Sequence, residues 1–179
     1  MANTNLIRGN LQNFEVYDET DGSDLLLGIA DVDLPELEPL TTDLKGAGIL
    51  GEVSSPVVGH FSDMSLTLKW RTIHRDLTEL SAPYGHKLTL RGAIQNYDSG
   101  SNKMVVSAAK ITVTGLPHKT ALGKFEPGES TESETEFGII YIKIDIDGVN
   151  ILELDKYNYK YSVNGTDYLA PTRAAVGRE

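Results

Sequence analysis

The chain has 179 residues, 40% of them hydrophobic and 23% charged, which is the composition of a globular domain with a sizeable core. It has no cysteine, which excludes disulfides and thiolate metal sites. With 26 acidic against 16 basic residues, the net charge of −10 disfavours specific binding to nucleic acid. No apolar run reaches the roughly 20 residues of a membrane-spanning helix, and the N-terminus lacks the pattern of a secretory signal. We therefore expect one domain over residues 1–179 that is made and folded in a cytoplasm.

An acidic turn at Asp18–Asp24 is the first feature along the chain. This turn and the step from Asp145 to Gly148 both offer carboxylates to a calcium ion, but neither continues to the remaining ligands of an EF-hand loop. Aspartate, serine and glycine are also the ordinary residues of tight turns. Turn formation is the favoured interpretation, and calcium binding is the alternative.

The next segment, between Leu34 and Gly59, is interrupted by prolines and glycines. Within it, Gly46–Gly51 fits the pattern G-x-G-x-x-G, which marks a dinucleotide site only where a buried strand precedes it and a helix follows. Here Glu52–Pro56 follows and opens no helix. We interpret the segment as a glycine-rich hairpin or loop.

Alternating apolar and polar residues dominate the rest of the chain and predict a mainly β fold. The predicted strands are Phe61–Trp70, Lys87–Tyr97, Met104–Thr114, Gly138–Ile146 and a last run from Ile151 to Tyr161. The second of them has two distinct faces, one with Leu88, Leu90 and Ile94, the other with Thr89, Arg91 and Gln95.

The fourth strand places four isoleucines on a single face, namely Ile140, Ile142, Ile144 and Ile146. It ends at Asp147-Gly148, a dipeptide suited to the positive φ angles of a type I′ hairpin turn. We therefore expect a β-hairpin that continues through Ile151 and Leu154.

Two short helices are also predicted. The first spans Thr72–Leu80, with apolar residues at helical spacing. The second follows Asn164-Gly165, with Thr166 or Asp167 as its cap and Gly177 after its end. Pro171 conflicts with this second helix unless it lies in the first turn.

The sequence contains no recognisable catalytic motif. Its four histidines, His60, His74, His86 and His118, show no metal-ligand spacing, and no G-x-S-x-G motif is present. We therefore predict a protein that is not an enzyme and that needs no cofactor and no metal.

Five segments form a recognisable series along the chain. They are GIADVDLPEL at 28–37, TDLKGAGILG at 42–51, LTLRGAIQ at 88–95, YIKIDIDGVNILELD at 141–155 and VNGTDYLAPTRAAVG at 163–177. Together they resemble the major tail tube proteins of contractile-tailed phages and R-type bacteriocins. The resemblance runs from about Leu11 to Gly177, and its order and spacing are more specific than any one motif.

The resemblance implies two packed antiparallel sheets and six subunits in a ring, each giving four strands to a shared barrel. A barrel of about two dozen strands holds water, so its strands need one polar face toward the lumen. We expect Thr89, Arg91 and Gln95 to face that lumen. Like-charged acidic walls would let DNA pass without specific binding.

The resemblance also implies contacts between subunits and with other tail proteins. We expect a hairpin at about residues 40–58 to protrude and pack on the adjacent subunit and the next ring, through Leu44, Gly46, Gly48, Ile49, Leu50, Gly51 and Val53. The C-terminal contact is expected at Asp167, Leu169 and Arg173. A sheath-facing acidic patch is expected at Glu129, Glu132 and Glu134, within a glutamate-rich segment that we interpret as a solvated loop.

Partners implied by the resemblance are further copies of the chain, a contractile sheath protein, the baseplate or tail initiator, and the tape measure and tail terminator proteins. The subunit would assemble in a bacterial cytoplasm into a virion tail or an extracellular tail-like particle. The runner-up function is the inner tube protein of a type VI secretion machine. A monomeric β-sandwich binding module is the alternative of a different class, although the chain has only one Trp and four Phe to form an aromatic binding platform.

Overall fold

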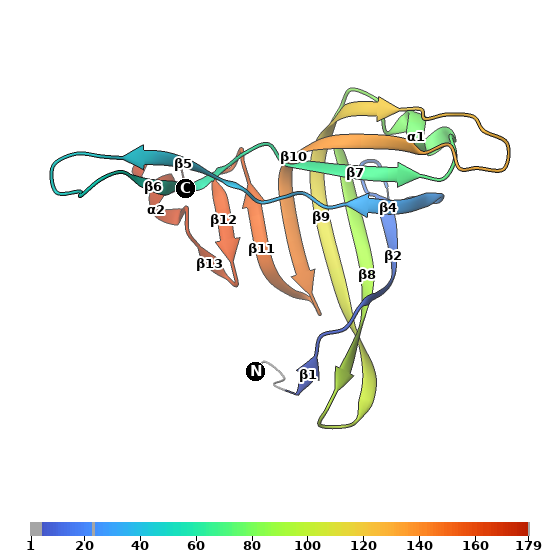
Figure 1. Ribbon diagram of the computed structural model, residues 1–179, viewed down its shortest axis with the longest axis horizontal. Coiled ribbons are helices and arrows are strands. Elements are labelled where there is room, and N and C mark those ends of the chain that lie inside the picture. Colours follow the sequence, from blue (N-terminus) through green and yellow to red (C-terminus); the bar gives the residue numbers. More distant parts are fainter. Residues whose placement is uncertain (1–4, 23, 179) are drawn as a thin grey trace.

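The computed structural model describes residues 5–22 and 24–178, and its fold is mainly β with two short helices (Figure 1). The first strands are β1 (Leu6–Ile7), β2 (Leu11–Asp18), β3 (Asp24–Leu26), β4 (Ile29–Asp33), β5 (Pro39–Leu44), β6 (Val53–Phe61) and β7 (Ser65–Trp70). Helix α1 (Arg75–Glu79) follows, then the long strands β8 (His86–Asp98), β9 (Lys103–Ala121) and β10 (Ser133–Ile146). The chain ends with β11 (Val149–Asp155), β12 (Lys160–Val163), β13 (Thr166–Asp167) and α2 (Ala170–Ala175).

The main sheet is antiparallel, and its strands follow the order β13-β12-β11-β10-β9-β8-β2-β3. Strand β10 connects this sheet to a second layer. Its first half, Ser133–Gly138, pairs with β7, and its second half, Tyr141–Ile146, pairs with β11, while β9 pairs along almost all of it. Strand β4 extends the second layer from β7, so β4 and β7 run across the upper parts of β8 and β9 (Figure 1). The strand path does not close on itself within the described chain.

The core lies between these two layers. The predicted alternation in β7 is confirmed, because Leu66, Leu68 and Trp70 are all at most 1% exposed. Helix α1, which is shorter than the predicted helix, closes one end of the core with Leu77. The opposing sheet completes the core with Val16, Leu88, Leu90, Val113, Phe137, Ile139, Ile142 and Leu154.

The prediction that four isoleucines of β10 share one face is wrong for Ile140. A bulge between Ile139 and Tyr141 shifts the pairing with β9, so Ile139 and Ile142 are buried although they are three residues apart. An inserted residue in one strand reverses the alternation beyond it. The turn after this strand is as predicted, with φ angles of 50° at Asp147 and 78° at Gly148.

The C-terminal helix begins later than predicted. Thr166 and Asp167 form the short strand β13, and the helix N-cap is Leu169 instead. Pro171 then lies in the first helical turn, where a missing N–H is tolerated. No helix of the described residues is both long and apolar enough to cross a membrane.

Strands β5 and β6 form a separate two-stranded sheet that extends from the body (Figure 1). We call β5, β6 and the turn between them, residues 39–61, the arm. All six residues of β5 are exposed, so the arm contributes almost nothing to the core. It leaves the second layer between β4 and β7 and points away from the β8–β9 hairpin.

The buried indole of Trp70 gives a test of the two-layer core. Its Nε1 donates a hydrogen bond of 3.1 Å to Oγ1 of Thr135 on β10. Thr135→Val keeps the shape but leaves the indole N–H without an acceptor, so we expect the free energy of unfolding to fall by about 1–3 kcal/mol. Denaturant unfolding measures it.

Thr67→Val, on the outward side of β7, is the matched control and should change stability little. An equal effect of both variants would contradict the importance of the Trp70 hydrogen bond.

Candidate functional site: assembly surfaces

The turn of the arm, from Lys45 to Glu52, is built by glycines. Gly48 and Gly51 have φ angles of 90° and 103°, a region open to glycine at little cost. A strand, β6, follows Gly51, as expected for a hairpin and not for a dinucleotide site. The predicted contact residues are exposed along the arm, with Leu44 at 45%, Ile49 at 39%, Leu50 at 106% and Val53 at 52%. The single chain therefore exposes these apolar side chains to water on a projection from the body.

The base of the arm is held by the C-terminal segment. Gly59 of β6 has a φ of 77°, and a Cβ at this position would lie 2.5 Å from a methyl carbon of Leu169. Only glycine therefore lets Leu169, which is 6% exposed, pack against this strand. Phe61 meets Tyr161 edge to face at 5.1 Å between ring centroids, and Lys156 Nζ donates to the carbonyl oxygen of Ser62.

The three C-terminal residues named from the sequence lie together. Arg173 donates to a carboxylate oxygen of Asp167 at 2.7 Å and to the carbonyl oxygen of Tyr159 at 2.8 Å. The backbone N–H of Leu169 donates to the other oxygen of Asp167. The hydrogen bond from Arg173 is the main reason why the pKa of Asp167 lies below its usual value. This ion pair holds α2 and Leu169 against β6 and β12.

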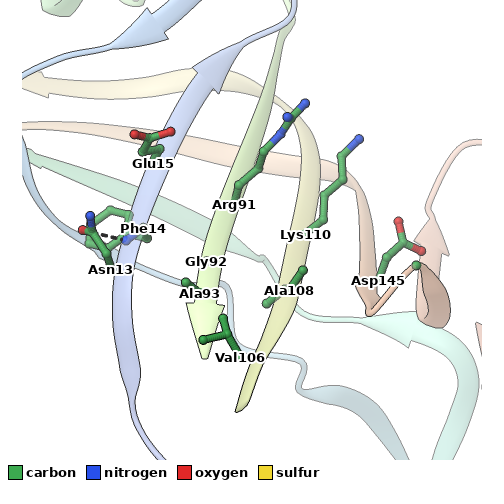
Figure 2. Close-up of a pocket in the computed structure, with 12 residues that line it drawn as sticks. Asn13, Phe14, Glu15, Arg91, Gly92, Ala93, Val106, Ala108, Lys110 and Asp145 are labelled. Atoms are coloured by element: carbon green, nitrogen blue, oxygen red, sulfur yellow. Dashed lines mark hydrogen bonds between the residues drawn. The ribbon is translucent and has the colours of Figure 1, made fainter. Parts of the chain in front are cut away.

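A polar face covers the side of the main sheet that does not meet the core. The strand register places Glu15, Arg91, Lys110 and Asp145 in one row across four neighbouring strands. Their side chains project from the same side of the sheet and line a shallow hollow of about 660 Å³ (Figure 2). In a single chain this face is open to water.

Two of the three residues predicted to face a lumen have accessible side chains on this polar face. Arg91 is exposed, with its guanidinium 4.8 Å from the ring centroid of Tyr17, and Gln95 is half-buried further along β8. Thr89 differs, because it is fully buried and hydrogen-bonds with Thr112 at 3.4 Å. Glu19 lies over it and accepts a hydrogen bond from it, so Thr89 supports the polar face from below.

The Glu19 carboxylate joins the basic residues around it. It lies 3.2 Å from Lys87 Nζ and 3.8 Å from the Arg91 guanidinium. Burial disfavours its ionised form, but hydrogen bonds from Lys87 and Thr89 outweigh this effect and hold the pKa of Glu19 below its usual value.

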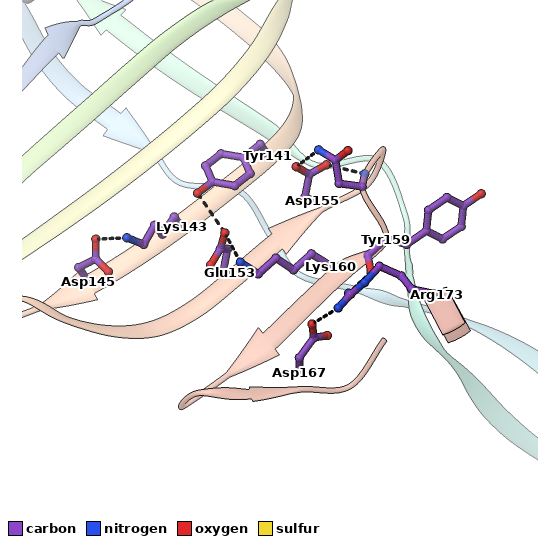
Figure 3. A network of polar contacts seen from close by, with 10 residues as sticks. Tyr141, Lys143, Asp145, Glu153, Asp155, Tyr159, Lys160, Asp167 and Arg173 are labelled. Atoms are coloured by element: carbon purple, nitrogen blue, oxygen red, sulfur yellow. Dashed lines mark hydrogen bonds and ion pairs between the residues drawn. The ribbon is translucent and has the colours of Figure 1, made fainter. Parts of the chain in front are cut away.

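A second group of polar contacts continues the face across β10, β11 and β12 (Figure 3). Glu153 lies 2.9 Å from Lys160 Nζ and accepts a hydrogen bond from the hydroxyl of Tyr141 at 3.4 Å. Burial, together with the Glu153 charge, raises the pKa of Tyr141 to about 12. Lys143 pairs with Asp145 at 3.3 Å, so charges of both signs alternate over this surface.

Charges of both signs occur together on the part of this face that follows the bulge of β10. The acidic residues there are Glu15, Glu19, Asp145, Glu153, Asp155 and Asp167, and the basic residues are Lys87, Arg91, Lys110, Lys143, Lys160 and Arg173. Five of these six basic groups lie within 3.8 Å of one of these acids. The net charge of −10 therefore comes from residues outside this set.

Comparison with known proteins agrees with this geometry. The family described as "Phage tail tube protein FII" matches residues 8–177. The chain belongs to this family. It is 27% identical over 152 residues to the tail tube protein of Escherichia phage P2, and the aligned region covers 82% of this chain and 85% of the relative. The fold resembles a chain of the sheath/tube terminator of an extracellular contractile injection system, with a TM-score of 0.53 and 10% identity over 76% of this chain and 95% of the other.

The protein is therefore a structural component of a contractile phage-type tail tube, with a mainly β fold of packed antiparallel sheets and two short helices. In this tail tube protein, the predicted acidic patch is divided. Glu129 and Glu132 are exposed in the loop between β9 and β10, and Glu132 shares Lys124 with Glu126 at 3.4–3.6 Å. Glu134 lies apart from this loop, on β10 opposite Lys69 of β7.

Sequence reasoning missed several residues of these surfaces. Gly59 was grouped with the other glycines of an irregular segment, and only its contact with Leu169 explains it. Lys110 and Thr112 could have been found, because they alternate with Ile111 and Val113 in the same way as the residues of the facing strand. Glu19 could not have been found from the sequence, because its place over Thr89 depends on the path of the turn after β2.

The ion pair of the C-terminal segment predicts a pH dependence. Because the pKa of Asp167 is depressed in the folded tail tube protein, the contribution of this carboxylate to the free energy of unfolding is complete near neutral pH. It begins to weaken as the pH falls past about 3.9 and is lost once the pH passes the lower pKa of the folded state. We expect Asp167→Asn to lower the free energy of unfolding by about 1 kcal/mol near neutral pH, with the difference vanishing in acid.

Thermal unfolding of the monomer across this pH range measures the difference. Glu129→Gln, in the exposed loop, is the matched control and should show no such trend. A difference between wild type and Asp167→Asn that persists at low pH would contradict the ion pair.

Proposed function

We propose that the chain assembles into rings of six copies that stack into a tube, a conduit for DNA or ions across the target cell envelope. The observation that carries this proposal is the open main sheet, which ends at β3 and β13 and keeps one polar face away from its core. Open sheet edges are a hazard unless a neighbour pairs with them. Head-to-tail contacts between identical subunits close into rings, and rings of this kind can stack.

The polar face is the surface that we assign to the lumen. A barrel shared by six copies would be wide enough to hold water, so its inner surface must tolerate hydration. Arg91 and Gln95 would line this lumen directly, with Thr89 below the Glu19 carboxylate. On the part of this wall that follows the bulge of β10, most cations already have an acidic partner. Paired cations leave little free positive charge for phosphates, so DNA would pass without specific binding.

The arm is the element that we assign to contacts between subunits and rings. It carries exposed apolar residues on a projection with no core of its own, and the C-terminal segment holds its base through Gly59 and Leu169. A monomer would expose this apolar surface to water, and a neighbouring subunit would cover it.

Other partners follow from membership in a contractile tail. We assign the outer surface to the sheath protein, and the two ends of the tube to the baseplate or tail initiator and the tail terminator. The lumen would hold the tape measure protein during assembly, which we place in the host cytoplasm. In the completed virion tail or extracellular particle the protein has no catalytic step to perform.

Deleting the turn of the arm tests this function directly. We expect the wild-type protein, once concentrated or mixed with tail initiator, to form hollow tubes of uniform diameter in negative-stain electron microscopy. Removing Gly46–Gly51 should leave a folded monomer that no longer polymerises, because these residues touch no part of the core.

Circular dichroism and thermal unfolding confirm the fold of the deletion variant. Intact tubes from this variant would contradict the role of the arm. A wild-type protein that stays monomeric under all these conditions would contradict the ring and favour a β-sandwich binding module.

The acidic loop predicts a salt-dependent contact with the sheath. Glu129 and Glu132 are exposed, and charges of this kind are screened beyond a Debye length of about 8 Å at physiological salt. Raising the salt to about 1 M, where the Debye length falls to about 3 Å, should weaken binding of sheath protein to preformed tubes. Replacing both glutamates with glutamine should do the same at low salt.

Co-sedimentation of sheath with tubes measures both effects. Asp21→Asn, exposed in the turn after β2 and outside both the arm and this loop, is the control. Sheath binding that is insensitive to salt would contradict an electrostatic contact.

A further inference from the structure

An apolar groove lies beside the second layer, on the core side of the main sheet. Strand β4 covers the upper parts of β8 and β9 but ends at Asp33, whereas both long strands continue beyond it (Figure 1). The core-facing positions that lie beyond β4 have no second layer above them in the single chain. They form a groove of about 530 Å³ whose apolar floor and lip are Leu11, Phe14, Val32, Leu34, Ile94 and Ile111.

The residues of this groove continue the core pattern of the main sheet. Ile94 and Ile111 share a face with Leu90, which is only 6% exposed, yet both are merely half-buried. At the lip, Leu11 and Leu34 are 56% and 50% exposed. A sheet face with the sequence of a core but without a covering layer is stabilised when another apolar element packs on it and removes it from water.

We propose that the groove receives the turn of the arm from a second copy of this chain, with Ile49 and Leu50 packed against Leu34 and Ile94. This inference rests on the proposed function, because it names the place on the neighbouring subunit where the arm binds.

The turn of the arm carries the apolar side chains that would fill the groove. Leu50 is fully exposed at the end of a turn whose glycines have no side chains to hinder a close approach. The groove is apolar where the leucine and isoleucine would enter, and a volume of about 530 Å³ is within the range of pockets that hold groups of this size.

The charges at the two surfaces are also complementary. Asp31 and Asp33 of β4 stand at the rim of the groove, with Lys69 bound to Asp33 at 2.8 Å. Asp31 is exposed, so the rim keeps a negative charge. On the arm, Lys45 lies at the start of the turn and makes only a loose contact of 3.8 Å with Glu52. Lys45 can therefore turn toward Asp31 of a neighbour.

The occupant must come from another copy, because the arm cannot reach its own groove. Strands β5 and β6 run away from the body (Figure 1), whereas the groove is lined by residues of β2, β4, β8 and β9. The C-terminal segment holds the base of the arm in this direction, through the contact of Leu169 with Gly59.

Cysteine cross-linking tests the contact, and the chain suits it because it has no cysteine of its own. The test variant carries Leu50→Cys and Leu34→Cys, two exposed positions whose replacement spares the core. In assembled tubes under mild oxidation, most chains should run as covalent dimers and higher multimers on a non-reducing gel. The same variant as a dilute monomer should stay single.

The matched control pairs Leu50→Cys with Phe125→Cys, which is 87% exposed in the loop between β9 and β10, away from the groove. It should form tubes but few covalent multimers. Tubes of the test variant without multimers, or multimers only in the control, would overturn the groove contact and leave the proposed function standing. Failure of the wild-type chain to form tubes at all would overturn the proposed function itself.

Discussion

The structure depends on one strand that belongs to two layers. The first half of β10 pairs with β7, the second half pairs with β11, and β9 pairs with β10 along almost its whole length. The bulge after Ile139 allows this change of partner and directs the side chains of Ile139 and Ile142 into the same core. Because β10 is paired on both sides along most of its length, the position of the second layer over the sheet follows from this pairing.

The consequence of this arrangement is a sheet with two different surfaces. Where β4 and β7 cover it, the sheet builds a core around Trp70 and Leu90, and on the opposite side it carries a polar face. The pairing of acids and bases on that face has a physical effect that net charge alone hides. Neighbouring charges of opposite sign satisfy one another over short distances, so the face stays hydrated without a strong field of either sign. The excess of acid lies elsewhere, for example at Asp31 and Asp33 of β4 and in the loop before β10.

The arm and the C-terminal segment form a second unit that depends on the first. Strand β6 has no partner in the main sheet, so the direction of the arm comes from side-chain contacts at its base, chiefly Leu169 on Gly59 and Phe61 on Tyr161. The ion pair between Asp167 and Arg173 holds Leu169 in that position. Residues at the end of the chain therefore orient an element that lies more than a hundred positions earlier, and apolar residues of the arm remain free for a neighbour.

Local periodicity and the order of motifs were enough to predict the mainly β class, the alternation in β7 and β8, the turn at Asp147-Gly148 and the family. The sequence also named Asp167, Leu169 and Arg173, which the structure brings together. Contacts between distant segments were needed to show that Thr89 lies under Glu19, that Ile140 leaves the core face, and that Glu134 is on β10 while Glu129 is in the preceding loop. The tertiary structure also revealed the groove beyond β4. The physical reason is that a bulge, a covering side chain or the end of an overlying strand depends on residues far apart in the chain, and alternation within one strand carries no record of them.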